Sequence, residues 1–142
     1  MDVPHGADYH SLKDRVVVIT GAGQGIGRAY AHHFADQGAI PVIAEIKAEE
    51  GANVAAEVQA AGGEALFIET DVGDMGSVTA MADAVLARYG RIDALINNAA
   101  MFTNLSHAPF WELDIEEWQR TMQVNVTGAY FCARAVAPVM KE

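Results

Sequence analysis

Residues 16–27 read VVVITGAGQGIG, an apolar β-branched run that breaks into four glycines within seven residues. The residues that follow, 28–37, are typical of a helix, so the order is strand, loop and helix. Glycines allow backbone angles and a close approach that a Cβ would forbid, while the free N–H groups and the dipole at a helix start attract a phosphate. The stretch therefore predicts a dinucleotide-binding site.

After this stretch, short apolar runs continue to alternate with helical segments. Strands are expected over 15–20, 40–44, 65–69 and 93–96, and further helices over 48–61 and 77–89. The first helix is expected to bury Ile26, Tyr30 and Phe34 and to end at Gly38. Strands and helices of these lengths argue for right-handed crossovers. We therefore expect an α/β fold, a Rossmann-like doubly wound parallel sheet with helices on both faces.

The last part of the chain is expected to be one long helix that follows a loop over 101–110. Asp114 with Glu117 forms an acidic version of a capping box, and Leu113 with Trp118 stands at the positions of a hydrophobic staple. Apolar residues then recur at intervals of three and four, and this apolar stripe consists of Trp118, Met122, Val126, Ala129, Ala133, Val136 and Met140.

The composition is that of an ordinary globular protein. At 142 residues the chain is long enough for one domain with a core, but short for a complete enzyme with two substrates. Hydrophobic residues make up 51% and charged residues 20%, as in a typical α/β protein. We expect a flexible N-terminal arm over 1–14 and a single domain over 15–142. The net charge of −10 disfavours nucleic acid and an anionic membrane as partners.

The single cysteine, Cys132, cannot form an internal disulfide, which favours a reducing, cytoplasmic compartment. The segment 1–14 lacks the apolar core of a signal peptide, and no run approaches the roughly 18 apolar residues of a membrane helix. The histidines are not spaced as metal ligands, so no metal site is expected. These features predict a soluble, cytoplasmic protein.

The glycine spacing departs from the common dinucleotide fingerprint, because no glycine stands five positions after Gly21 or Gly23. It fits another spacing, Thr20-Gly21-x-x-x-Gly25-x-Gly27, which resembles the cofactor motif of the classical short-chain dehydrogenase/reductase family. Three further motifs match that family in the expected order. They are Asp71-Val72 after the third strand, Asn97-Asn98-Ala99-Ala100 after the fourth, and Asn125-Val126-x-Gly128 in the long helix.

The resemblance, which covers residue 15 to the end of the chain, implies a role for each motif. Asp71 resembles the aspartate that contacts the adenine, and Asn125 resembles the catalytic asparagine. Ala100 stands where the family usually has glycine, which puts a methyl group beside the cofactor, and we expect adjustment rather than loss. The cofactor-binding residues that the resemblance and the chain itself indicate are Gly21, Gly25, Ile26, Gly27, Glu45, Asp71, Val72, Asn98 and Ala99.

Glu45 ends the second strand about 20 residues past the glycines, which is the position of a ribose-binding carboxylate. A carboxylate accepts hydrogen bonds from the adenosine ribose hydroxyls and repels a 2′-phosphate, so Glu45 favours NAD over NADP. The glycine loop contains no lysine or arginine, and Lys47 is the one cation nearby in the sequence. A surface glutamate without a role is the alternative interpretation.

The resemblance implies an oxidoreductase that transfers a hydride between nicotinamide and a secondary alcohol or ketone. In the family, a Ser and a Tyr-x-x-x-Lys that follow the long helix perform the acid–base step, and no residue here can be given those roles. Tyr130 with Arg134, and Tyr9 with Lys13, lie in the wrong segments. We therefore expect the N-terminal, cofactor-binding part of such an enzyme, truncated or a fragment, with little or no turnover.

A non-catalytic nucleotide-binding or interaction module is the alternative function, and the ordered match of four motifs argues against another Rossmann-type protein such as a methyltransferase. The family's sheet continues past the fourth strand, so we expect an incomplete sheet, a bare apolar edge and a partly uncovered apolar stripe. Self-association is therefore expected. Because the family often packs this helix against a partner subunit, the resemblance implies a homo-oligomer, in addition to a small alcohol or ketone as substrate.

Overall fold

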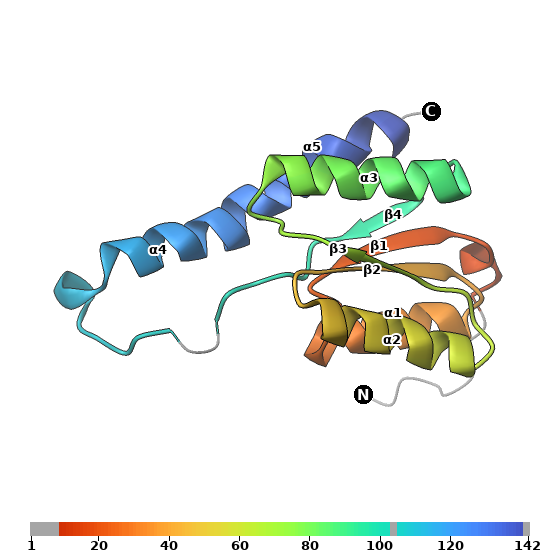
Figure 1. Cartoon of the computed structure of the whole chain (residues 1–142), viewed down its shortest axis with the longest axis horizontal. Helices are drawn as coiled ribbons and strands as arrows, with labels where there is room; N and C mark the ends of the chain where they lie inside the picture. The colour runs from red at the N-terminus through yellow and green to blue at the C-terminus, as the bar shows by residue number, and fades with distance from the viewer. Residues whose placement is uncertain (1–8, 103–104, 141–142) are drawn as a thin grey trace.

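The computed structural model describes residues 9–102 and 105–140, and its centre is a four-stranded sheet (Figure 1). The strands are β1 (Val16–Thr20), β2 (Ile40–Glu45), β3 (Leu66–Glu69) and β4 (Ala94–Ile96). They lie in the order β3-β2-β1-β4, and every neighbouring pair is parallel. The strands β1 and β2 therefore lie inside the sheet, and β3 and β4 form its edges. The strand that follows β1 in the sequence lies on one side of it, and β4 lies on the other.

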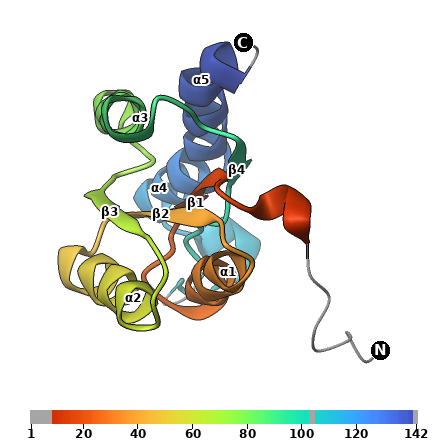
Figure 2. The same ribbon diagram turned by 90° about the vertical axis from the view of Figure 1, so that its right-hand side faces the viewer.

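Helices cover both faces of the sheet, as Figure 2 shows in a view near the strand direction. One face carries α1 (Gly25–Asp36) and α2 (Ala48–Ala60), and the other carries α3 (Met75–Tyr89) and α5 (Ala129–Met140). Side chains alternate along a strand, so Val17 and Ile19 belong to the core under α1 and α2, while Val16 and Val18 belong to the core under α3 and α5. The predicted α/β doubly wound parallel sheet is confirmed.

The first helix buries a different face from the one predicted. Ile26 is 68% exposed and Tyr30 is 41% exposed, and the buried residues of α1 are Gly27 and Ala31. The large apolar side chains have the spacing of a buried helix face. However, α1 lies so close to the end of β1 that only small residues fit on its buried face. Phe34 alone of the predicted trio lies against the core under α1 and α2.

The long C-terminal helix is divided into three segments rather than one. These are α4 (Ile115–Met122), a π-helical segment η3 (Gln123–Gly128) and α5, after a short 3₁₀ turn η2 (Phe110–Glu112). Asp114 caps α4 as predicted, because its carboxylate accepts a hydrogen bond from the Glu116 N–H at 2.9 Å. The predicted capping box does not form, since the Glu117 carboxylate instead accepts hydrogen bonds from Ser106.

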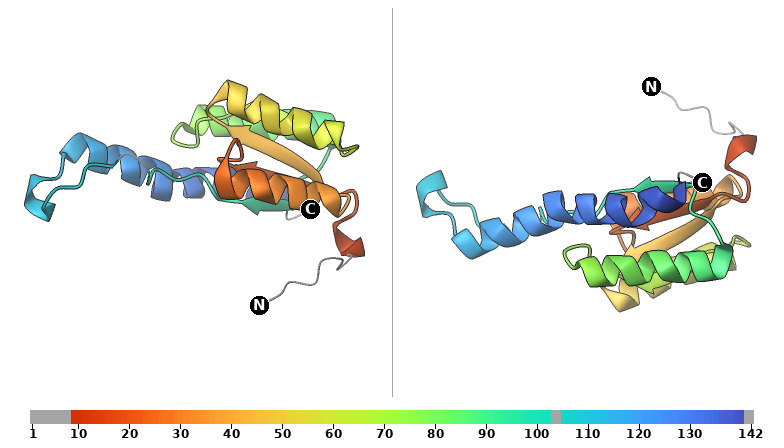
Figure 3. Two further views of the ribbon diagram at one scale, coloured as in Figure 1. Left: turned by 90° about the horizontal axis from the view of Figure 1, so that it is seen from below. Right: turned by 90° about the horizontal axis from the view of Figure 1, so that it is seen from above.

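The helix α4 projects beyond the sheet, whereas η3 and α5 lie against the rest of the fold (Figures 1 and 3). Cys132 and Val136 of α5 are buried against α3, whereas Trp118, Met122 and Val126 are exposed. Of the predicted apolar stripe, Val136 is buried and Ala129 is half-buried, and the other members are exposed, including Ala133 and Met140 on α5. The stripe is therefore largely uncovered, as expected from the sequence. Within the described residues, every helix is too short or too polar to cross a membrane.

Part of the predicted N-terminal arm is tied to the domain. Residues 1–8 of that arm lie outside the described residues. The segment His10–Leu12 forms a 3₁₀ turn, η1. The Tyr9 N–H donates a hydrogen bond to the Gln37 side chain at 2.7 Å, and the Asp14 N–H donates to the Gly38 carbonyl at 2.8 Å. Residues 9–14 are thus fastened to the end of α1 instead of forming a loose arm.

Asp93 joins the edge strand β4 to the central strand β1. Its carboxylate accepts a hydrogen bond from the Val16 N–H at 2.9 Å, one from the Arg15 guanidinium at 2.9 Å, and others from Arg91. Burial of the carboxyl group by itself raises its pKa. The bonds from Arg91, the Val16 N–H and Arg15 outweigh burial, so the pKa of Asp93 lies below its ordinary value.

We expect Asp93→Asn to lower the free energy of unfolding at pH 7 by about 1–3 kcal/mol, because charged hydrogen bonds to a largely buried group are lost. A carboxyl group with a depressed folded-state pKa stabilises the protein above its unfolded pKa of about 3.9 and loses that effect as pH falls through the folded pKa. Urea unfolding between pH 7 and pH 3 should therefore show the difference shrinking at acid pH. Asp83→Asn, on the exposed face of α3, is the matched control, and an equal loss in both variants would contradict the prediction.

Candidate functional site

The glycine loop between β1 and α1 has a shape that side chains would obstruct. Gly21 has a φ of +64° and Gly25 has a φ of +55°, in the left-handed region that favours glycine. A Cβ on Gly27 would lie 2.3 Å from the Gly21 carbonyl oxygen and 2.6 Å from Nδ2 of Asn98. The loop can therefore close tightly only with glycine at these positions, and it leaves the first turn of α1 open to solvent at Gly25 and Ile26.

Thr20, the first residue of the glycine motif, fastens the loop to the segment after β4. The sequence placed it in the motif but predicted no role for its side chain. Its buried hydroxyl accepts hydrogen bonds from the N–H groups of Asn98 and Ala99, both at 3.0 Å, and donates to the Ile96 carbonyl at 3.3 Å. The available signal was its position as the one polar residue at the end of an apolar run. A hydroxyl at the end of a strand can form hydrogen bonds with backbone groups of the neighbouring strand in the sheet, which here is β4.

Asn98 binds the start of the glycine loop through its side-chain amide. Its Nδ2 donates hydrogen bonds to the carbonyls of Thr20 at 3.0 Å and Gly21 at 3.1 Å. These bonds engage the amide group of Asn98 with the protein's own backbone. Of the two residues predicted to bind a cofactor here, Asn98 is placed as a supporting residue, and Ala99 lies beside Gly21, where a Cβ on that glycine would meet the Ala99 Cα at 2.8 Å.

Glu45 ends β2 beside the glycine loop, with only 7% of its surface exposed. One carboxylate oxygen accepts a hydrogen bond from the Gly23 N–H at 2.9 Å, and the other accepts one from the Lys47 N–H at 3.1 Å. A Cβ on Gly23 would lie 2.8 Å from the Glu45 Cγ. The carboxylate is thus held against the loop by backbone donors, and each oxygen keeps a lone pair for another donor.

The cations closest in sequence to this carboxylate are paired with glutamates of α2. The Lys47 ammonium lies 3.5 Å from Glu50, and the Arg28 guanidinium donates a hydrogen bond to Glu57 at 2.8 Å. His32 lies 2.9 Å from the same Glu57 oxygen. The bond from Arg28, with that from His32, holds the pKa of Glu57 below its ordinary value. The neighbourhood of Glu45 therefore keeps a negative character.

Asp71 and Val72 follow β3 and differ in exposure. Asp71 is exposed, and its carboxylate accepts a hydrogen bond from the Gly73 N–H at 2.8 Å. Val72 is buried against Gly128 of the π-helical segment, where a Cβ would lie 2.9 Å from the Val72 Cγ2. The Gln123 amide donates a hydrogen bond to the Gly73 carbonyl at 2.7 Å. The loop after β3 is thus held at both ends of η3.

Asn125 lies inside η3 and pairs with the loop after β4. Its Oδ1 accepts a hydrogen bond from the Met101 N–H at 2.7 Å, and its Nδ2 donates to the Met101 carbonyl at 3.0 Å. Both ends of the amide are therefore engaged with backbone, which fixes the loop relative to the helix. The side chain predicted to be catalytic thus makes both of its hydrogen bonds with the backbone of Met101, and its catalytic role stays a prediction.

The predicted site residues come together at one edge of the sheet, because the carboxyl ends of parallel strands meet there. The glycine loop, Glu45, Asp71 and Asn98 follow β1, β2, β3 and β4 respectively. The strand order reverses between β1 and β4, and open α/β sheets bind ligands in the crevice at such a point. The arrangement fits an extended ligand that crosses several strand ends.

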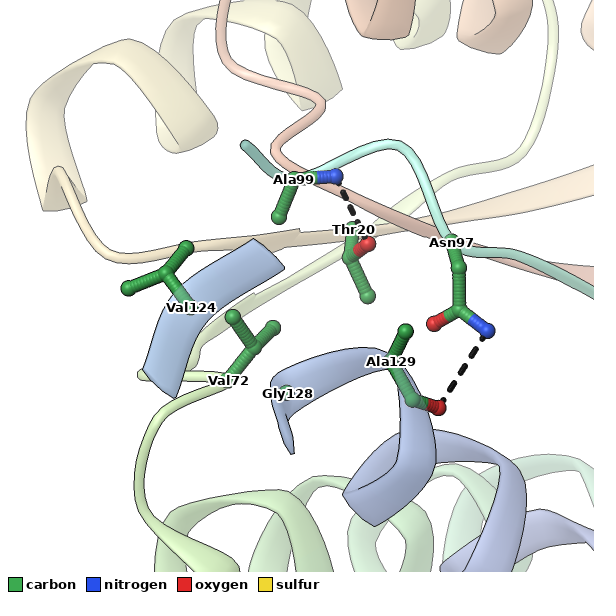
Figure 4. A pocket seen from close by; sticks show the side chains of 7 residues that line it. All are labelled: Thr20, Val72, Asn97, Ala99, Val124, Gly128 and Ala129. Atoms are coloured by element: carbon green, nitrogen blue, oxygen red, sulfur yellow. Dashed lines mark hydrogen bonds between the residues drawn. The ribbon is translucent and has the colours of Figure 1, made fainter. Parts of the chain in front are cut away.

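A small pocket lies beneath this edge, between the sheet and η3, and Figure 4 shows its lining. Its volume of about 10 Å³ has room for about one water molecule, so it cannot hold a nicotinamide ring. The Asn97 amide donates a hydrogen bond to the Ala129 carbonyl at 3.4 Å across it. The pocket is lined by Thr20, Val72, Asn97, Ala99, Val124, Gly128 and Ala129.

The chain is similar to proteins of known class. A family model described as short chain dehydrogenase matches residues 15–142. An uncharacterized oxidoreductase of Thermotoga maritima is 42% identical over 129 residues, which cover 91% of this chain and 49% of the relative. A cis-4-hydroxycyclohexanecarboxylate dehydrogenase of Sinomonas cyclohexanicum is 40% identical over 124 residues, with 87% and 49% covered. The chain thus spans about half the length of the curated relatives it matches.

Solved structures agree with these relatives. A short chain dehydrogenase/reductase from Burkholderia phymatum in complex with NAD superposes with a TM-score of 0.86 at 36% identity, covering 91% of this chain and 45% of that one. A metagenomic short-chain oxidoreductase in complex with NADP superposes with a TM-score of 0.85 at 37% identity, covering 92% and 58%. The similar structures therefore include complexes with both nicotinamide cofactors.

Proposed function

The chain belongs to the short chain dehydrogenase family, and from this premise we propose that its residues form the NAD-binding part of an oxidoreductase. The observation that carries the proposal is the pairing of a glycine loop with the carboxylate of Glu45 at adjacent strand ends. A Cβ at Gly21 or Gly27 would overlap backbone atoms of the site, so the tight loop requires glycine at these positions. A tight glycine loop of this kind fits a dinucleotide, because it lets the ligand approach the backbone closely. Such a loop at a helix start favours a pyrophosphate.

Each strand end is assigned one part of the dinucleotide. Gly21, Gly25, Ile26 and Gly27 would hold the pyrophosphate at the start of α1. Glu45 would accept hydrogen bonds from the ribose hydroxyls of the adenosine. Asp71 and Val72 would contact the adenine, while Asn98 and Ala99 would support the cofactor beyond the loop. Together these roles describe one proposed binding site.

We propose that NAD is preferred over NADP. A 2′-phosphate near Glu45 would be repelled by its buried carboxylate, and Lys47, two residues along the chain, is paired with Glu50. Similar structures hold NAD in one case and NADP in another, so the preference rests on Glu45.

The bound cofactor would supply a hydride acceptor or donor for the carbon of a secondary alcohol or ketone, and a relative named for a hydroxycyclohexanecarboxylate supports that substrate class. Within this chain, Asn125 would position Met101 and the loop beside the cofactor. The 142 residues contain no Tyr-x-x-x-Lys after Asn125. By themselves we expect these residues to bind the cofactor with little or no turnover.

We also propose a homo-oligomer in the cytoplasm. The side chains of Trp118 on α4, Val126 on η3 and Tyr130 on α5 are exposed along the C-terminal helical segments, and a second copy of the chain would cover them. Burial raises the pKa of the Cys132 thiol to about 11, which keeps this thiol inert and suits a reducing compartment. Sedimentation velocity at micromolar concentration tests the assembly, and a single monomeric species would count against it.

Titration of the expressed protein with NADH and NADPH, followed by nicotinamide fluorescence, tests the binding proposal. We expect saturable binding of NADH and at least tenfold weaker binding of NADPH, a difference of about 1.4 kcal/mol. The absence of binding for both cofactors would overturn it. A non-catalytic nucleotide-binding module is the second candidate, and it predicts NADH binding without turnover of any alcohol even when the gene's full coding sequence is expressed.

A further inference from the structure

Gly51 occupies an unfavourable place for its residue type. It is the fourth residue of α2 and is buried, although glycine is the least favourable residue in a helix interior apart from proline. The rest of α2 is rich in alanine, which would suit the same position better by helix propensity alone. The presence of glycine at this point therefore needs a reason in the packing.

The reason lies in the side chain of Phe67 on β3. A Cβ on Gly51 would lie 2.3 Å from the Phe67 Cε2 and 2.5 Å from its Cδ2, and 3.1 Å from the Glu45 Cβ. Phe67 is paired in register with Ile43, two residues before Glu45, so their side chains share the face of the sheet under α2. The phenyl ring therefore fills the space between the sheet and α2 that a side chain at position 51 would need.

Glu45 is consequently enclosed by two glycines from different elements. Gly23 of the loop lies on one side, where a Cβ would approach the Glu45 Cγ to 2.8 Å, and Gly51 lies on the other. We propose that Gly51 is a positioning residue for cofactor selectivity, because a side chain there would be crowded between the Phe67 ring and Glu45 and would disturb the Glu45 carboxylate where it accepts the Gly23 N–H. This inference rests on the proposed NAD site.

Filling the Gly51 position should disturb the carboxylate more than the rest of the loop. The methyl group of Gly51→Ala must displace the Phe67 ring or the Glu45 side chain, and the 2.9 Å bond between the carboxylate and the Gly23 N–H is the contact most directly affected. NADH would lose part of its ribose contact, while NADPH would meet less repulsion. We expect the ratio of NADPH Kd to NADH Kd to fall about tenfold.

The test measures both dissociation constants in the expressed protein and in four variants. Gly51→Ala is compared with Phe67→Leu, with the double variant, and with Val85→Ala, which loses core volume in α3 on the opposite face. We expect the ratio to fall in Gly51→Ala, to recover to within about threefold of the parent in the double variant, and to stay unchanged in Val85→Ala. Thermal unfolding reports the stability of each variant separately.

The outcomes distinguish this inference from the proposed function. If the parent protein does not prefer NADH, the proposed NAD site fails and Gly51 has nothing to position. If the parent prefers NADH but Gly51→Ala keeps the same Kd ratio at reduced stability, Gly51 is a packing residue only and the inference is overturned. If Gly51→Ala does not fold, the double variant decides. A folded double variant whose Kd ratio stays about twofold or more below that of the parent supports the inference, whereas a ratio equal to that of the parent makes Gly51 a packing residue only.

Discussion

Gly27→Ala is expected to abolish NADH binding and to lower the free energy of unfolding by about 3 kcal/mol, the upper range for overpacking. The new methyl group would overlap the Gly21 carbonyl at 2.3 Å, Nδ2 of Asn98 at 2.6 Å and the Ala22 Cα at 2.8 Å. Two of these three atoms belong to the backbone, so no flexible side chain can absorb the overlap. Fluorescence titration and urea unfolding measure the two effects.

Gly25→Ala separates binding from folding. No atom lies within 4 Å of the position of its Cβ, so the variant should fold with only the strain of its φ of +55°, about 1–2 kcal/mol. Its methyl group would stand at the open start of α1, where the pyrophosphate is proposed to lie. We expect at least a tenfold loss of NADH affinity in a folded protein, and unchanged affinity would contradict the proposed use of the loop.

Gly76→Ala serves as the matched control for both loop variants. It also adds one methyl group to a glycine in the first turn of a helix, but the nearest atom is the Asp74 Oδ1 at 3.4 Å, an ordinary contact. We expect NADH affinity to remain unchanged and stability to stay equal or rise by up to about 1 kcal/mol, because alanine favours a helix. A loss of binding here would mean that the assay reports general damage.

Glu45→Gln is expected to weaken NADH binding by about tenfold to a hundredfold and to leave NADPH binding equal or tighter. A hydrogen bond to a charged carboxylate contributes about 1.5–3 kcal/mol, against about 0.5–1.5 kcal/mol for a neutral pair, and the same charge is the source of the repulsion toward a 2′-phosphate. In addition, one of the two backbone donors, Gly23 N–H or Lys47 N–H, would face an amide NH₂ group. Paired titrations with NADH and NADPH measure the change in selectivity.

The matched control for this variant is Glu49→Gln. Glu49 lies four residues further along, in the first turn of α2, and is exposed. The Glu49→Gln variant removes the same charge from the same region. Because exposed charges are screened by salt, the ratio of the two dissociation constants should stay within about twofold of the ratio in the parent protein. Equal effects in the two variants would show that net charge, and not the position of Glu45, governs the preference.

The strands and the first three helices could be predicted because their signals are local. Continuous Val and Ile runs indicate buried parallel strands, and glycines such as Gly38 and Gly90 end helices through their left-handed conformation. The glycine spacing with Glu45 likewise indicated a site before any contact was known. Each of these features depends on residues within one element or at its end.

The errors share one cause, which is that periodicity does not show how closely two elements approach. Ile26 and Tyr30 have the spacing of a buried face, yet α1 lies so near the loop that only Gly27 and Ala31 fit beneath it. Glu117 has the spacing of a capping box, but Ser106 of the preceding loop competes for its carboxylate. The contact between Asn125 in the π-helical segment and Met101 likewise joins two segments that no spacing relates.

By itself, the sequence determined the α/β class, the strand and helix order and the glycine loop, because backbone preferences and apolar periodicity act over a few residues. Only the tertiary structure decided that the Thr20 hydroxyl holds the segment after β4, that the Gly23 N–H holds Glu45, and that Gly51 leaves room for Phe67. These contacts join residues far apart in the chain. Their geometry is set by the distances between packed elements, which local sequence does not specify.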